Sequence, residues 1–360
     1  MTKLEIVKRK SEHVEISLKY NVRGTLSTLF EDVFLIHNAI PELDYDDIDT
    51  SINFLGYKFN APIFITGMTG GYVEAKRINS IIARVVEEMG LGMGVGSQRA
   101  GLRNPELIET YRIARKKAPT IFLVGNIGAT QVIRGSYKDI EMLIDMIDAD
   151  ALAVHLNALQ ECIQPEGEPL FKGFLTKMKK IKEKIDKPII IKETGCGFSR
   201  ENILNIVDIG IDAIDIGGAG GTSFAIIESI RAEKCKDFLR RDLGKLFSNW
   251  GIPTAASILE VRSVSSIPLI ASGGIRNGLT IAKALILGAD LVGIGLPVLR
   301  AIENKGEEGL KYMLTRMIEE LKTTMFLLGV RSVNELKRSK RYIILGRLRE
   351  WIKERGIRIR

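Results

Sequence analysis

A run of chemically versatile polar residues follows an apolar stretch near the middle of the chain. His155, Asn157, Gln160 and Glu161 come directly after residues 150–154, which are typical of a buried strand. Side chains alternate along a strand, so His155 and Asn157 are expected on one side, with Gln160 and Glu161 in the loop above. A histidine can donate a proton, and a carboxylate can hold Mg²⁺ together with a phosphate. The cluster therefore indicates a functional site, although a lone histidine can also be a satisfied structural residue.

Lys192 follows three isoleucines in the segment Ile-Ile-Ile-Lys-Glu-Thr-Gly. Lysine is seldom buried without a partner, so this side chain should meet an anion, an electron-rich ring or a carbonyl carbon. Three interpretations stay open: contact with a cofactor, a Schiff-base nucleophile, or an ion pair with Glu193 or another carboxylate.

Glycine-rich loops late in the chain indicate a phosphate site. Residues 268–295 are predicted to form a strand, a glycine loop with Gly273 and Gly274, a helix and a further strand. Glycines allow close backbone approach, and a helix start favours an anion. With the glycine loop before Thr222 and the turn at Gly295, this loop suits the phosphate of flavin mononucleotide (FMN) or of a phosphorylated substrate. No GxGxxG motif follows an early strand, which argues against a classical dinucleotide site.

Three cationic or potentially cationic residues, Arg9, Lys10 and His13, lie within five positions near the start of the chain. They could cover a second anion, or they could belong to a solvated terminus.

The elements that must position these residues alternate regularly. Eight apolar runs are predicted as strands: 62–67, 92–96, 120–126, 150–156, 188–193, 213–217, 268–272 and 291–295. Amphipathic stretches such as 75–89, 106–118 and 171–185 separate them. This alternation predicts an α/β fold, a (β/α)₈ TIM barrel, with a doubly wound sheet as the alternative. Glycines and polar residues follow five of the strands, which places them on the carboxyl-terminal rim, where barrel enzymes keep their sites.

The segments outside the barrel predict three parts: an N-terminal cap over residues 1–61, a barrel over residues 62–299 and a C-terminal helical extension over residues 300–360. The net charge of the 360-residue chain is +8, and residues 331–360 account for all of it, with eleven Lys or Arg against three Glu. A neutral barrel with a basic tail argues against a groove that tracks nucleic acid. The tail is interpreted as a solvated face or a subunit contact, with binding to RNA or anionic lipid as the alternative.

The sequence has no apolar run long enough to span a membrane, and its start is too charged for a secretory signal. Its three cysteines are odd in number and lack metal-ligand spacing, which favours a reducing compartment. We therefore expect a cytoplasmic protein.

Taken in order, these motifs resemble those of type 2 isopentenyl-diphosphate isomerases, the flavin-dependent form of that enzyme. The resemblance runs from Arg9 to about Leu299, and the run His-Leu-Asn-Ala-Leu-Gln-Glu at residues 155–161 is highly specific. The other matching segments cover residues 9–13, 66–71, 94–99, 124–128, 192–195, 220–222 and 271–276.

The resemblance implies conversion of isopentenyl diphosphate to dimethylallyl diphosphate with FMN, Mg²⁺ and a reductant such as NADPH, in a homotetramer or homooctamer. It implies that FMN is held by Thr66, Gly67, Met68, Thr69, Ser97, Asn126, Lys192, Thr222, Gly274, Ile275, Arg276, Gly295 and Leu296. The implied substrate-binding residues are Arg9, Lys10, His13, Ser97, Gln98, Arg99, Asn157 and Gln160. Glu161 is expected to hold the metal ion, and Gln160, His155 and Lys192 are the expected catalytic residues.

Other classes of protein share some of these sequence features with the isomerases. An FMN-dependent oxidase of 2-hydroxy acids shares the barrel and the phosphate loops, but it would need a base late in the barrel, and the three histidines stand at positions 13, 37 and 155. An inosine-monophosphate dehydrogenase relative would need a nucleophilic loop cysteine in a matching motif. Two further alternatives are a Schiff-base lyase that uses Lys192 and a protein that binds partners through its basic tail.

Overall fold

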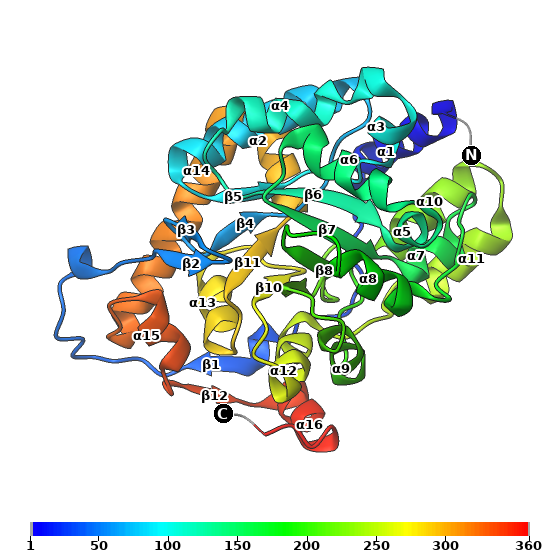
Figure 1. Cartoon of the computed structure of the whole chain (residues 1–360). Helices are drawn as coiled ribbons and strands as arrows, with labels where there is room; N and C mark the ends of the chain where they lie inside the picture. Colours follow the sequence, from blue (N-terminus) through cyan, green and yellow to red (C-terminus); the bar gives the residue numbers. More distant parts are fainter. Residues whose placement is uncertain (1–2, 359–360) are drawn as a thin grey trace.

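The computed structural model describes residues 3–358, and a closed barrel of eight parallel strands forms its centre (Figure 1). The strands run around the barrel in chain order, and β11 pairs with β4 to close it. Each predicted strand overlaps one of them, so the predicted barrel is confirmed and the doubly wound alternative is wrong. The bounds are β4 (Ile63–Ile65), β5 (Gly92–Gly94), β6 (Leu123–Gly128), β7 (Ala151–Leu156), β8 (Ile189–Glu193), β9 (Ala213–Asp215), β10 (Leu269–Ser272) and β11 (Leu291–Ile294).

Helices surround the barrel and bury its outer surface. The predicted amphipathic stretches form α2, α4 and α8, and the isoleucines of β8 are buried because both faces of a parallel strand are covered. The bounds are α2 (Val73–Met89), α3 (Arg99–Arg103), α4 (Glu109–Lys117), α5 (Ala129–Arg134), α6 (Tyr137–Ile147), α7 (Ala158–Ile163), α8 (Phe174–Lys182), α9 (Arg200–Val207), α10 (Phe224–Lys234), α11 (Phe238–Leu246), α12 (Thr254–Val264) and α13 (Gly278–Ile286).

The segment before the barrel closes both of its ends. Helix α1 (Lys3–Lys19) packs on α10, α14 and α3 and brings its residues to the mouth of the barrel. The hairpin of β2 (Ile52–Phe54) and β3 (Tyr57–Phe59) covers the opposite end, where the rings of Phe54 and Phe59 lie 6.2 and 6.0 Å from that of Phe122. Phe122 directly precedes β6, so this plug sits at the amino-terminal end of the strands.

The chain after β11 continues as α14 (Leu296–Leu328), which packs on α13 and α2 as the eighth helix of the barrel. The helix is interrupted at Lys305 and Gly306, where the backbone is not helical. The predicted division between residues 299 and 300 therefore falls inside one helix. Among the described residues, no helix is both long and apolar enough to span a bilayer.

The last segments return beneath the barrel. Helix α15 (Val333–Arg338) is followed by β12 (Tyr342–Ile344), which pairs antiparallel with β1 (Val33–Leu35), and by α16 (Gly346–Glu354) (Figure 1). Several cations of this basic tail are used in docking. Lys337 pairs with Asp290, and Arg355 Nε donates to Glu260 at 2.7 Å.

Glu260 on α12 is the main polar anchor of α16. Its carboxylate is fully buried and accepts hydrogen bonds from Trp351 Nε1 at 2.9 Å and from Arg355. We expect Glu260→Ala to lower the free energy of unfolding by about 2 kcal/mol, because Trp351, Arg355 and the backbone N–H of Arg200 lose a charged acceptor, while Arg355 can still reach water. Urea unfolding measures the change. Glu350→Ala, on the exposed side of α16, is the control. Equal losses of unfolding free energy in both variants would contradict the anchoring role of Glu260.

Candidate active site

A cavity opens at the carboxyl-terminal rim of the barrel, beneath α1. It is lined by side chains from α1, from the strand ends and from the loops that follow them. Of the 22 residues predicted for the site, the cavity brings together twenty: Arg9, Lys10, His13, Thr66, Gly67, Met68, Ser97, Arg99, Asn126, His155, Asn157, Gln160, Glu161, Lys192, Thr222, Gly274, Ile275, Arg276, Gly295 and Leu296.

The structure places the other two predicted residues, Gln98 and Thr69, away from the cavity. Gln98 is fully buried; its Nε2 donates to the carbonyl of Leu143 at 2.8 Å, and its Oε1 accepts from the N–H of Asn126 at 2.8 Å. Thr69 Oγ1 bonds to Oδ1 of Asn79 at 2.7 Å. Both side chains fasten rim loops to the surrounding helices, so they support the site from behind.

His155 and Asn126 form a fixed pair on neighbouring strands. Nδ1 of His155 lies 2.7 Å from Oδ1 of Asn126, whose Nδ2 donates to the carbonyl of Val95 at 3.1 Å. The amide oxygen must therefore accept, which assigns the histidine proton to Nδ1 and leaves Nε2 as an acceptor. Burial, with Lys192 and other nearby cations, lowers the pKa of His155 to about 3. The ring is neutral at ordinary pH.

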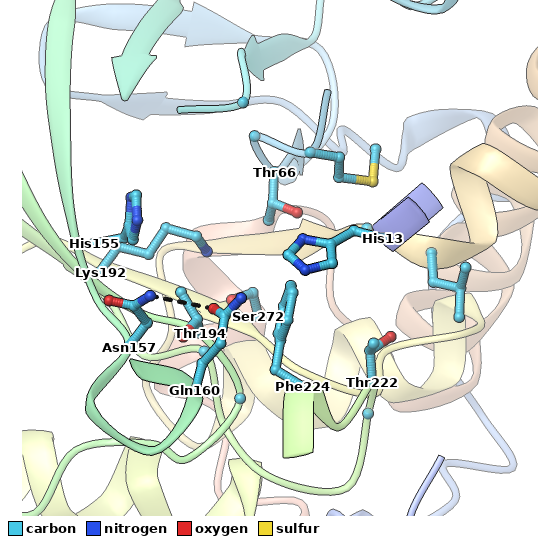
Figure 2. A pocket seen from close by; sticks show the side chains of 18 of the residues that line it. His13, Thr66, His155, Asn157, Gln160, Lys192, Thr194, Thr222, Phe224 and Ser272 are labelled. Carbon is cyan, nitrogen blue, oxygen red and sulfur yellow. Dashed lines mark hydrogen bonds between the residues drawn. The ribbon is translucent and has the colours of Figure 1, made fainter. Parts of the chain in front are cut away.

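Asn157 and Gln160 face one another at the start of α7 (Figure 2), and Glu161 follows Gln160 in the same helix. Nδ2 of Asn157 donates to Oε1 of Gln160 at 3.2 Å and to Oε1 of Glu161 at 3.0 Å. The Gln160 amide is thereby held in one orientation at the cavity wall. Among the described residues, no group of three or more His, Cys, Asp or Glu is placed to hold a metal ion, so Glu161 offers a single carboxylate.

A buried charge network that the sequence analysis missed connects α1 to α10. The Glu228 carboxylate is fully buried; it accepts from Nε2 of Gln160 at 2.9 Å and from Nη1 of Arg231 at 2.6 Å, and it lies 2.8 Å from Nε2 of His13. Burial alone would raise the pKa of Glu228, but His13, Arg231 and Gln160 lower it to about 2. Arg231 also donates to Glu12 at 3.0 Å, which fastens α1 over the cavity.

No sequence signal marks this network. Glu228 and Arg231 stand three positions apart on a helix, a spacing that is equally common for a solvated ion pair. Only the packing of α10 under α1 shows that both are buried.

The predicted cations of α1 have different environments. Nζ of Lys10 donates to the carbonyls of Gly70 and Ser97 and to Oη of Tyr111, at 2.8, 2.5 and 2.9 Å. Burial, with Arg9 and Arg99, lowers the pKa of Lys10 to about 7. This lysine therefore anchors α1 to the rim.

Two buried guanidinium nitrogens lack any hydrogen-bond partner within the described chain: Nε of Arg9 and Nε of Arg99. Leaving such donors unpaired is costly unless a ligand completes them. Both side chains line the cavity, so this end of it fits an anion.

A second part of the cavity lining is built from the backbone of two glycine loops. A Cβ on Gly221 would lie 2.5 Å from the nitrogen of Gly274, and Gly273 has a φ of +112°, so only glycine allows these two loops to touch. Arg276 is half-buried beside Arg23 and Arg300; its burial and these two like charges lower the pKa of its guanidinium. A backbone cradle beside clustered arginines fits the phosphate of FMN.

Lys192 has a charged partner within the protein. Its Nζ donates to Oδ2 of Asp215 at 2.5 Å, so the ion pair with another carboxylate is observed, while Glu193 accepts instead from the N–H groups of its own loop. Lys192 also lines the cavity, which keeps contact with a cofactor compatible with the structure.

Comparisons with known proteins agree with this geometry. Residues 172–342 match the model of the FMN-dependent dehydrogenase family. The chain is 47% identical to an isopentenyl-diphosphate delta-isomerase from Ignicoccus hospitalis, over 98% of both proteins. It is 48% identical to a protein of the same name from Sulfurisphaera tokodaii, over 100% of this chain and 97% of that one.

Among solved structures, a lactate oxidase from Pediococcus acidilactici superposes with a TM-score of 0.68 over 96% of this chain and 94% of the other. The two sequences are only 15% identical, so this match shows similarity of the fold alone. The full-length identity to the named isomerases decides the family: the chain belongs to the FMN-dependent, type 2 isopentenyl-diphosphate delta-isomerases.

Proposed function

We propose that this protein converts isopentenyl diphosphate to dimethylallyl diphosphate, with FMN bound across the mouth of the barrel, as a step of isoprenoid biosynthesis. The observation that supports this proposal is that two separate groups of residues lining one cavity are each suited to hold an anion. A glycine cradle with Arg276 suits the FMN phosphate, and the unpaired nitrogens of Arg9 and Arg99 suit a diphosphate. The amides of Asn157 and Gln160 lie within the same cavity.

The reaction adds a proton to an unactivated alkene and removes another from a neighbouring carbon. Its transition state has the character of a tertiary cation, which requires a strong acid and a site without nucleophilic water. Reduced FMN, when bound, supplies and accepts these protons without net redox change, and NADPH is the proposed reductant that keeps it reduced.

The protein's own residues orient the substrate around this chemistry. Gln160 is held by Asn157 and Glu228 and presents a fixed amide to the cavity, which suits substrate orientation or proton relay. His155 is neutral, so we assign it an accepting hydrogen bond at Nε2. Its lowered pKa makes it a poor source of protons near neutral pH.

We propose that Mg²⁺ enters with the substrate. Mg²⁺ is commonly held by one or two carboxylates together with phosphate oxygens and water. Glu161 is a single carboxylate at the cavity wall, held by Asn157 and by Nε2 of Gln164 at 3.1 Å. It fits a metal ion whose other ligands come from the diphosphate and water.

We also propose a cytoplasmic homotetramer or homooctamer. Helix α11 supports assembly, because its apolar side chains face outward: Leu239 is 73% exposed, Leu246 is 75% exposed and the nearby Trp250 is 62% exposed. Apolar side chains gathered in this way are typical of a protein contact. The reducing environment inferred from the cysteines supports the location.

The function is tested by anaerobic incubation of the holoenzyme with isopentenyl diphosphate, Mg²⁺ and either reduced or oxidised FMN. We expect dimethylallyl diphosphate, measured by ¹H NMR, only with reduced FMN. Lactate and mandelate serve as controls for an oxidase. Bleaching of oxidised FMN by either acid, without isomerisation of the diphosphate, would support the rival function.

The protonation of His155 can be followed by NMR of protein labelled with ¹⁵N-histidine. Its resonances should not titrate between pH 5 and 8. The unfolded chain takes up this proton near pH 6.5 and the folded chain near 3, so His155 should cost stability as pH falls through that window. A His155 titration near pH 6.5 in the folded protein would contradict a neutral ring.

The metal site is tested with Glu161→Gln. Removing the carboxylate charge should raise the Mg²⁺ concentration for half-maximal activity about tenfold or more, while FMN affinity, measured by fluorescence quenching, stays unchanged. Glu141→Gln, on the exposed face of α6, is the matched control. An unchanged Mg²⁺ requirement in Glu161→Gln would remove Glu161 from the site.

A further inference from the structure

Asp215, a residue that the sequence analysis did not single out, lies beneath the cavity. It ends β9, between Lys192 on β8 and Ser272 on β10, and its side chain is 2% exposed. Its Oδ2 accepts from Nζ of Lys192 at 2.5 Å, and its Oδ1 accepts from Oγ of Ser272. Three adjacent strands thus meet in one buried polar cluster.

The cluster lies at the floor of the cavity. Lys192 and Ser272 line the cavity itself, whereas Asp215 lines a small void deeper in the barrel, which Lys192 also reaches. The ammonium therefore separates the carboxylate from the ligand space. An ammonium has three donors, and the bond to Asp215 uses one of them, so others stay available for a ligand above.

The charges of the pair cancel. A lone lysine in this position would present a full positive charge to a bound ring, but Asp215 compensates it at hydrogen-bond distance. Both partners are buried, with exposed fractions of 12% and 2% for Lys192 and Asp215, so water screens the pair little. The floor presents an oriented, neutral ion pair.

From this geometry we propose that Asp215 is a positioning residue for the cofactor: it fixes the Lys192 ammonium and sets the electrostatic potential, and thereby the reduction potential, of bound FMN. The proposal rests on the proposed function in requiring FMN in the cavity. Ser272 supports it by holding the second oxygen of Asp215, which prevents the carboxylate from turning toward the ligand.

The sign of the effect follows from charge balance. When two electrons from a reductant such as dithionite and one proton convert FMN to its anionic reduced form, the bound cofactor gains one negative charge. A more positive floor stabilises that charge and a more negative floor opposes it. A buried pair kept only for stability predicts no such pattern, since replacing both partners is often neutral for folding.

The test is a set of reduction potentials of bound FMN, measured by dithionite titration against reference dyes. Asp215→Asn should favour the reduced form at least tenfold, which is about 30 mV more positive for a two-electron couple. Lys192→Met should shift the equilibrium at least tenfold the other way. The double variant, whose floor is again neutral, should return to within about threefold of wild type.

Asp212→Asn is the matched control, because Asp212 accepts from Nζ of Lys182 at 2.5 Å just before β9 but outside the cavity. In this variant, the equilibrium between oxidised and reduced FMN should stay within about threefold of the wild-type value. A double variant that behaves like Lys192→Met alone would overturn the proposal, as would an unshifted potential in Asp215→Asn. If Asp215→Asn fails to fold, the comparison of Lys192→Met with the double variant still decides the question.

These outcomes are separate from those of the proposed function. A wild-type protein that binds no FMN, or binds it without isomerising the diphosphate, contradicts the function. A wild-type protein that does both, with potentials insensitive to Asp215, contradicts only this inference.

Discussion

Parallel closure of eight strands is the constraint on which the rest of this structure depends. Because every crossover returns the chain to the same end of the barrel, all eight carboxyl ends meet at one rim. His155, Lys192 and Gly274, which are far apart in the sequence, are thereby placed around one cavity. The amino-terminal end is sealed by aromatic side chains of the hairpin β2–β3, so the polar residues of the rim face a single opening.

Charge compensation then determines what this opening can hold. Where the protein supplies its own partner, charges are tightly paired, as in Glu228 with Arg231 and Asp215 with Lys192. Nε of Arg9 and Nε of Arg99, in contrast, have no hydrogen-bond partner within the described residues. Buried donors without partners mark the places where a ligand must complete the structure. We therefore propose that an anion binds where α1 brings Arg9 to the cavity.

Residues whose role follows from local pattern were predictable from the sequence. The isoleucines before Lys192 identify β8, and period-two alternation correctly places His155 and Asn157 at one cavity. Gln98 and Thr69 were different, because side chains in a rim loop have no fixed period and neighbours can point to opposite sides. Glu228 and Asp215 gave no signal, since the contacts that show their roles come from other elements. These are His13 and Gln160 for Glu228, and Lys192 and Ser272 for Asp215. The last residue of the barrel could not be predicted from the sequence either, because its eighth helix, α14, continues past the predicted boundary at Leu299.

The fold alone does not distinguish an isomerase from an oxidase, since the lactate oxidase barrel superposes along almost the whole chain. The difference has to lie in the side chains around the cavity. In this protein α1 brings Arg9 and His13 over the cavity, and the Glu228–Arg231 pair holds the helix there through His13 and Glu12. An oxidase of hydroxy acids needs a base that takes up a proton near neutral pH, and His155 is neutral and has its proton fixed toward Asn126. The rim thus gathers cations and amide side chains around one cavity, a set that suits a large anion.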